Sequence, residues 1–104
     1  MWFAGMFHQL HWNMQAMLET IQRLIDEKGG LSIAARDLTR DADLYRAGLT
    51  PFSAIQVMIS LEKEFKIEFP DWMLNRQSMS SINAIISCLC ELQEHRGEAP
   101  ARAA

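Results

Sequence analysis

The chain has 104 residues, of which 49% are hydrophobic and 22% charged, and its formal net charge is −3. This length predicts one domain, and the hydrophobic fraction is ordinary for a globular chain and too high for a disordered one. The slight acidity argues against a basic stripe of the kind that binds nucleic acid. We therefore expect a single globular domain with no nucleic-acid partner.

The first thirteen residues contain no Asp, Glu, Lys or Arg, but several large aromatic side chains. They lack the basic start and the small-residue cleavage site of a signal peptide, and they are shorter than the roughly 20 apolar residues that span a membrane. We interpret residues 1–13 as an apolar extension or a start-site artefact. His8 and His11 have no third ligand nearby, so we predict no metal site.

Apolar residues spaced alternately by four and three form a heptad-like seam from this extension into the next helix. Its members are Phe3, Phe7, Leu10, Met14, Met17, Ile21 and Leu24. One interpretation is a longer first helix that packs on its own domain. The alternative is a self-association or partner-docking surface, with a homodimer formed through residues 1–25.

An amphipathic helix is predicted over residues 14–28, and Gly29 and Gly30 end it. A long connection follows over residues 31–49. Regularly placed apolar residues indicate that this loop is pinned to the core, and long ordered loops are often functional. These residues are Leu31, Ile33, Leu38, Leu44 and Leu49.

A second helix is predicted over residues 51–65. Thr50 is a good N-cap, and Pro51 suits the first helical position, where its missing N–H has no intrahelical partner to lose. Phe52, Ile55 and Ile59 recur at helical spacing and are predicted to face the core. The predicted exposed positions are Ser53, Gln56, Ser60, Glu62, Lys63 and Glu64.

Residues 71–76 are predicted to form a short third helix, with Trp72 as one of its apolar contacts. Ser80 is the expected N-cap of the last helix, and residues from 96 onward form a flexible tail. Cys88 and Cys90 lie about 200° apart on a helix, which favours two reduced thiols in a cytoplasmic protein. The predicted core is Leu18, Ile21, Ile25, Leu44, Phe52, Ile55, Ile59, Phe65, Ile85 and Leu89.

The centre of the chain resembles the acyl or peptidyl carrier proteins, which bind phosphopantetheine. The resemblance runs from about residue 38 to residue 92, and it rests on Leu44, Gly48, Leu49, Phe52, Leu61, Glu62, Phe65, Ile67, Phe69 and Pro70. It implies an all-α bundle of three main helices plus one short helix, with a long loop between the first two. The carrier-like domain would cover residues 14–95, between the extension at 1–13 and the tail at 96–104. The segment Glu68–Arg76 looks most like the aminoacyl carrier subgroup.

The resemblance also places the attachment site for 4'-phosphopantetheine. The family serine falls at Pro51, and the acid before it falls at Thr50. Proline cannot be modified, so no cofactor is expected on this sequence, although the family would carry one on a serine at position 51. Ser53 is a candidate substitute, and so is Thr50. The proline is either a natural loss or a substitution introduced to block modification.

The resemblance implies a non-enzyme that presents its second helix to an acyl- or aminoacyl-handling ligase, transferase or synthase. The partner-binding residues would be Thr50, Phe52, Ser53, Gln56 and Trp72. No catalytic spacing of Ser, His, Cys or Asp and no Gly-rich phosphate loop is present. The alternatives are a non-covalent interaction or regulatory module on the same fold, which could dimerise through its extension, and an unrelated helix-in-groove adaptor.

Overall fold

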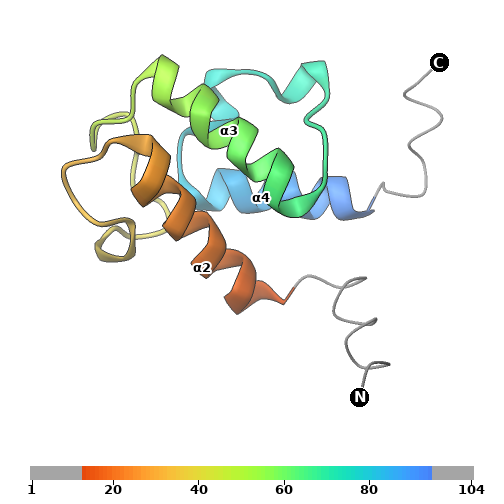
Figure 1. The fold of residues 1–104 in the computed structure, drawn as a ribbon, viewed down its shortest axis with the longest axis horizontal. Coiled ribbons are helices and arrows are strands. Elements are labelled where there is room, and N and C mark those ends of the chain that lie inside the picture. Colours follow the sequence, from red (N-terminus) through yellow and green to blue (C-terminus); the bar gives the residue numbers. More distant parts are fainter. Residues whose placement is uncertain (1–12, 95–104) are drawn as a thin grey trace.

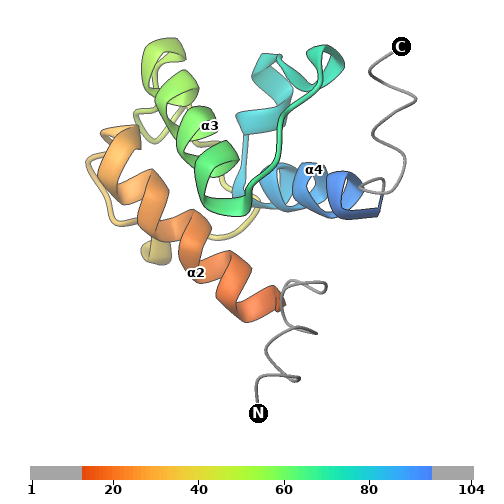
Figure 2. The same ribbon diagram turned by 45° about the vertical axis from the view of Figure 1, so that its right-hand side comes forward.

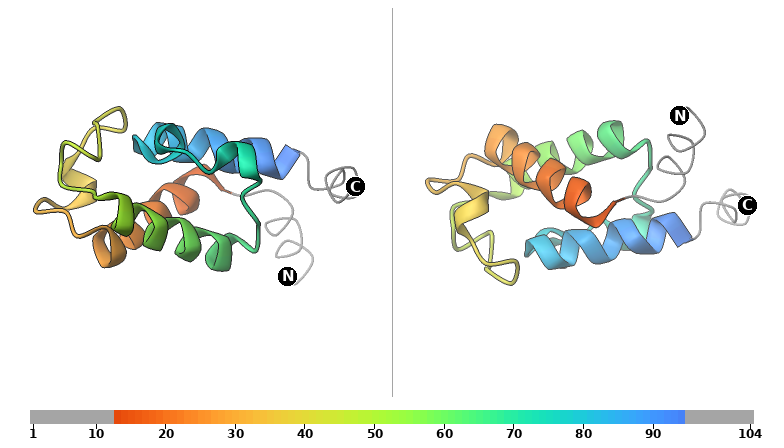
Figure 3. Two further views of the ribbon diagram at one scale, coloured as in Figure 1. Left: turned by 90° about the horizontal axis from the view of Figure 1, so that it is seen from above. Right: turned by 90° about the horizontal axis from the view of Figure 1, so that it is seen from below.

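The computed structural model describes residues 13–94, which contain three α-helices and no β-strand (Figure 1). The helices are α2 (Met14–Leu24), α3 (Pro51–Phe65) and α4 (Ile82–Glu94). Figure 3 shows them as one bundle, with α2 running opposite to α3 and the long loop after α2 at one end. The all-α prediction and the bounds predicted for the second helix are confirmed.

The first helix begins with a side-chain cap at Asn13. Its backbone is extended, with ψ 128°, and its Oδ1 atom accepts the N–H of Ala16 at 3.1 Å. The helix therefore starts at Met14, and no continuous helix runs through Asn13. Residues 1–12 of the predicted seam lie outside the described residues, whereas Met17, Ile21 and Leu24 of the same seam are buried in their own core.

The end of the first helix lies at the predicted pair of glycines. A π-helical turn, η1 (Ile25–Gly29), continues α2, and Gly30 then adopts the left-handed conformation with φ 72°. Glycine suits this position because it has no Cβ to clash there. Gly29 is buried against Leu49 and Val57, so η1 brings the end of the first helix onto α3.

The hydrophobic core differs from the predicted one on α3. Ile21, Ile25, Leu44, Ile85 and Leu89 are buried as expected, and Leu18 and Phe65 are half-buried. The prediction is wrong for Phe52, Ile55 and Ile59, which are exposed. The residues of α3 that are buried are Ala54, Val57 and Leu61.

The physical reason is that α3 carries two apolar stripes. At about 100° per residue, Ala54, Val57 and Leu61 share one side of the helix, and Phe52, Ile55 and Ile59 share the other. Only one stripe can face the domain's own core. Because the inward stripe is different from the predicted one, the polar residues Ser53, Gln56, Ser60 and Glu62 are half-buried rather than exposed, while Lys63 and Glu64 are exposed as predicted.

The loop over residues 31–49 is attached to the start of α4. The N–H of Leu44 donates to the carbonyl oxygen of Ser80 at 2.8 Å, and the N–H of Asn83 donates to the carbonyl oxygen of Arg40 at 3.0 Å. Leu44 and Leu49 are buried, which confirms that the loop is pinned, although Ile33 is 40% exposed. The loop also contains a short 3₁₀ turn, η2 (Ala35–Asp37).

The connection from α3 to α4 contains two 3₁₀ turns in place of the one predicted short helix. These are η3 (Asp71–Met73) and η4 (Arg76–Met79), and they are separate because Leu74 and Asn75 leave the helical conformation. Figure 2 shows this connection folding back from the end of α3, and η4 packs against that helix.

The last helix is capped one residue later than predicted. The hydroxyl of Ser81 accepts the N–H of Ala84 at 3.0 Å, and its carbonyl oxygen accepts the N–H of Ile85 at 3.1 Å. Ser80 instead has a helical backbone, and its hydroxyl donates to the carbonyl oxygen of Gln77. Ser81 is therefore the residue that caps α4.

Candidate functional site

The first turn of α3 is fixed by a reciprocal cap between Thr50 and Ser53. The N–H of Ser53 donates to Thr50 Oγ1 at 3.0 Å, and the N–H of Thr50 donates to Ser53 Oγ at 2.8 Å. The two hydroxyl oxygens are 3.0 Å apart, and Ser53 Oγ also donates to the carbonyl oxygen of Thr50 at 3.1 Å. This arrangement satisfies N–H groups that a helix start would otherwise leave unpaired.

Pro51 is the first residue of α3 and is exposed. Proline is favoured at this position because its ring already has a helical φ and no N–H is needed there. It has no hydroxyl to which a phosphodiester could be joined. The hydroxyls next to it along the chain, those of Thr50 and Ser53, are both held in the cap. The first turn of α3 therefore does not fit covalent attachment of 4'-phosphopantetheine.

Beside this turn, large apolar side chains point from α3 into solvent. Phe52 is 72% exposed, Ile55 53% and Ile59 42%. They follow one another by three and four residues, so they form one continuous stripe, which we call the outer face. Exposed apolar residues are common singly, but a contiguous group of them marks a surface that binds another molecule.

The outer face leads into a groove between α3 and the connection that follows it. The groove has a volume of about 730 Å³. Its apolar lining comes from Ile55, Met58 and Ile59 on α3 and from Phe69, Leu74 and Met79 on the opposite side. Pro51 also lines it, so the groove starts at the capped turn of α3.

Charged groups around the groove are mostly acidic. Glu62, Glu68 and Asp71 line it, together with one guanidinium, that of Arg76. Glu62 Oε2 accepts the N–H of Phe69 at 2.9 Å, which holds the exit of α3 against the helix. The groove therefore combines an apolar floor with a predominantly negative rim.

An aromatic residue, Tyr45, stands beside the charged end of the groove. Its ring lies 3.8 Å from Cζ of Arg76, which is a cation–π distance. Burial raises the pKa of Tyr45, Arg76 acts in the opposite direction, and Asp43 adds to the increase. The hydroxyl is therefore protonated at neutral pH and can donate a hydrogen bond.

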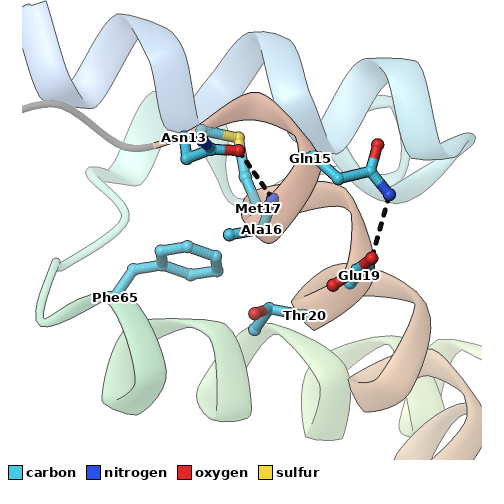
Figure 4. Close-up of a pocket in the computed structure, with 7 residues that line it drawn as sticks. All are labelled: Asn13, Gln15, Ala16, Met17, Glu19, Thr20 and Phe65. Carbon is cyan, nitrogen blue, oxygen red and sulfur yellow. Dashed lines mark hydrogen bonds between the residues drawn. The ribbon is translucent and has the colours of Figure 1, made fainter. Parts of the chain in front are cut away.

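A second hollow, of about 560 Å³, lies between the start of α2 and the end of α3. Ala16 and Met17 line it from α2, and Phe65 lines it from α3 (Figure 4). Gln15 and Glu19 form a hydrogen bond along its edge. No described residue lines both this hollow and the groove, so the two are separate.

The structure gathers four of the six residues assigned to the site by sequence, which are Thr50, Pro51, Phe52 and Ser53. Gln56 is half-buried one turn later. Trp72 is 59% exposed on η3 and does not line the groove. Sequence reasoning missed Ile55 and Ile59 as surface residues. The available signal was that α3 has more apolar positions than one buried face can use.

No three His, Cys, Asp or Glu side chains of residues 13–94 are grouped so that they could hold a metal ion. No helix of this part of the chain is long and apolar enough to cross a membrane.

Comparisons with known proteins decide the family. A model described as the phosphopantetheine attachment site matches residues 18–89. The chain belongs to this family of carrier proteins. A curated aminoacyl carrier protein from Agrobacterium fabrum is 44% identical to it over 69 residues, which is 66% of this chain and 83% of the relative. Family members carry a prosthetic group and are not themselves catalysts, which agrees with the non-enzyme interpretation.

Solved carrier structures share the fold. One is a carrier protein from Agrobacterium tumefaciens, bound to an engineered glycine:carrier protein ligase from Bradyrhizobium japonicum with AMP. It is 40% identical, with a TM-score of 0.68, and the match covers 69% of this chain and 96% of that one. The solution structure of ATC2521 from A. tumefaciens is 36% identical, with a TM-score of 0.63, over 78% of this chain and 98% of that one.

Proposed function

We propose that this carrier-family protein docks onto an amino-acid ligase through the outer face of α3, and that it carries no phosphopantetheine arm. Pro51 stands where the resemblance to the family places the attachment serine. The ligase is proposed as the partner because a carrier 40% identical to this chain forms a solved complex with a glycine:carrier protein ligase.

The observation that carries the proposal is the exposure of Phe52, Ile55 and Ile59 directly after Pro51. Aromatic side chains at the centre of an interface contribute much of the binding energy when a partner buries them. The negative rim of the groove adds the electrostatic part, because it favours a partner surface with basic groups around an apolar centre. The capped turn keeps this face in place, since Thr50 and Ser53 fix the start of α3.

Isothermal titration of the whole chain into the glycine:carrier protein ligase tests the docking. We expect Phe52→Ala to weaken binding by about tenfold or more, which is the range of an interface hot spot. Met14→Ala is the matched control, because Met14 is an exposed apolar residue on α2 that does not line the groove. The same loss in both variants, or in neither, would contradict docking through the outer face.

Intact mass tests the missing arm. After incubation with a broad-specificity phosphopantetheinyl transferase and coenzyme A, the unaltered chain should keep its mass. Pro51→Ser, treated in parallel, should gain one phosphopantetheine and so show that the transferase recognises the fold. A gain on the unaltered chain would place the arm on Ser53 or Thr50 and would refute this part of the proposal.

A further inference from the structure

Resting on the proposed docking to a ligase, we infer that this chain is a competitive inhibitor of amino-acid loading onto arm-bearing carriers. It occupies the carrier site of the ligase through the outer face and the groove. It then offers no thiol to the activated amino acid, so the ligase is held without turnover.

The hydroxyl needed for attachment is absent at Pro51, although the helical turn that would hold it is well built. Pro51 is a favourable first residue of a helix, and the reciprocal cap of Thr50 and Ser53 surrounds it. Replacing a serine by proline at an interior helical position would break the helix, whereas at this position it leaves the start of α3 intact. Loss of the attachment group has therefore not disturbed the surface beside it.

The thiols of the chain's own cysteines cannot replace the thiol of the arm. Cys88 and Cys90 both lie on α4 and are half-buried. Burial also raises the pKa of Cys88, so its reactive thiolate form is disfavoured. Neither cysteine lines the groove next to Pro51. A ligase bound at the outer face therefore meets no thiol acceptor among residues 13–94.

The docking surface next to Pro51 is exposed along its whole apolar stripe. Phe52, Ile55 and Ile59 are all exposed, and the groove beside them is open over about 730 Å³. Its rim combines three carboxylates with the guanidinium of Arg76. Such a surface is complementary to a partner with apolar residues at its centre and basic residues around them, and the occupant that we assign to it is the carrier-binding surface of the ligase. A chain that binds there and accepts nothing competes directly with a carrier that does accept.

Steady-state kinetics test the inference. The ligase is the glycine:carrier protein ligase, and its substrate is the A. tumefaciens carrier bearing its arm. The apparent KM for that carrier should rise linearly with the concentration of this chain, and kcat should stay unchanged. Phe52→Ala should be a weaker inhibitor by about tenfold or more, and Met14→Ala should match the unaltered chain.

Two outcomes separate this inference from the proposed function. If titration shows binding through Phe52 but the chain does not change the KM, the docking stands and the competition is wrong. If titration shows no binding, the proposed function itself fails. Pro51→Ser that has received its arm should be glycylated as a substrate. An arm-bearing variant that stays unglycylated would mean that something other than the missing arm prevents loading, and the inference would be overturned.

Discussion

Replacing Leu61 with alanine should destabilise the domain far more than replacing Ile59, although the two residues lie in the same helix. Leu61 is fully buried at 0% exposure, and Ile59 is 42% exposed. Truncating a buried leucine to alanine costs about 3 kcal/mol or more, because a cavity remains where the side chain was. Each fully buried methylene contributes about 0.8 kcal/mol, so losing the half-buried carbons of Ile59 costs about 1 kcal/mol.

Thermal and urea unfolding monitored by circular dichroism measure this difference. For a domain of this size, about 1 kcal/mol corresponds to roughly 4–8 °C in Tm. Leu61→Ala should therefore lower Tm by roughly 12–24 °C and Ile59→Ala by roughly 4–8 °C. The urea slope should stay constant in both variants, which shows that the comparison reflects stability alone. Equal losses, or a larger loss for Ile59→Ala, would mean that the outer face belongs to the core after all.

Three further predictions concern positions away from the outer face. Gly48→Ala should cost about 1–3 kcal/mol by urea unfolding, because Gly48 has φ 122°, whereas Gly29→Ala should be close to neutral because a Cβ there makes ordinary contacts. Asn13→Ala should cost about 1 kcal/mol, since the cap of α2 is lost. In a Cys90→Ser background, alkylation of Cys88 should reach its half-maximal rate at a pH above the ordinary thiol pKa of about 8.5, because burial raises the pKa of Cys88.

The raised pKa of Cys88 also determines the direction in which stability changes with pH. The folded state holds the Cys88 proton more tightly than the unfolded state. The contribution of this buried thiol to the free energy of unfolding is therefore complete below a pH of about 8.5 and is lost as the pH rises above it. Cys88→Ala should therefore flatten the alkaline loss of stability relative to the unaltered chain. An identical alkaline profile in both proteins would show that the burial of Cys88 has no effect on folding. If Gly48→Ala and Gly29→Ala lower the free energy of unfolding equally, backbone strain at Gly48 is not the cause of the loss.

Local signals in the sequence were sufficient to predict α3. The Thr50 cap, Pro51 at the first position and the end at Phe65 depend on neighbours along the chain, and all three are confirmed. Spacing could not show which side of α3 is buried. A buried apolar stripe has the same helical period as an apolar stripe that is left exposed for a partner. Spacing therefore predicts a core position for Phe52, Ile55 and Ile59, which are in fact exposed.

The shape of the connection between α3 and α4 also could not be predicted from neighbouring residues in the sequence. Its shape depends on contacts that helical spacing does not predict, such as the hydrogen bond from the N–H of Phe69 to the carboxylate of Glu62. The groove also depends on how separate segments pack, because its two sides come from α3 and from residues up to Met79. Sequence spacing alone does not show that these two segments face each other across a hollow.

The attachment of the loop to α4 has a consequence for local unfolding. The amides of Leu44 and Asn83 are far apart in sequence, but each is protected by a hydrogen bond between the loop and the start of α4. They can exchange with solvent only when these two segments separate, so they belong to one opening unit. The same loop leads directly into Thr50. A partner that clamps the first turn of α3 should therefore slow deuterium uptake at the start of α4, a site that it does not touch.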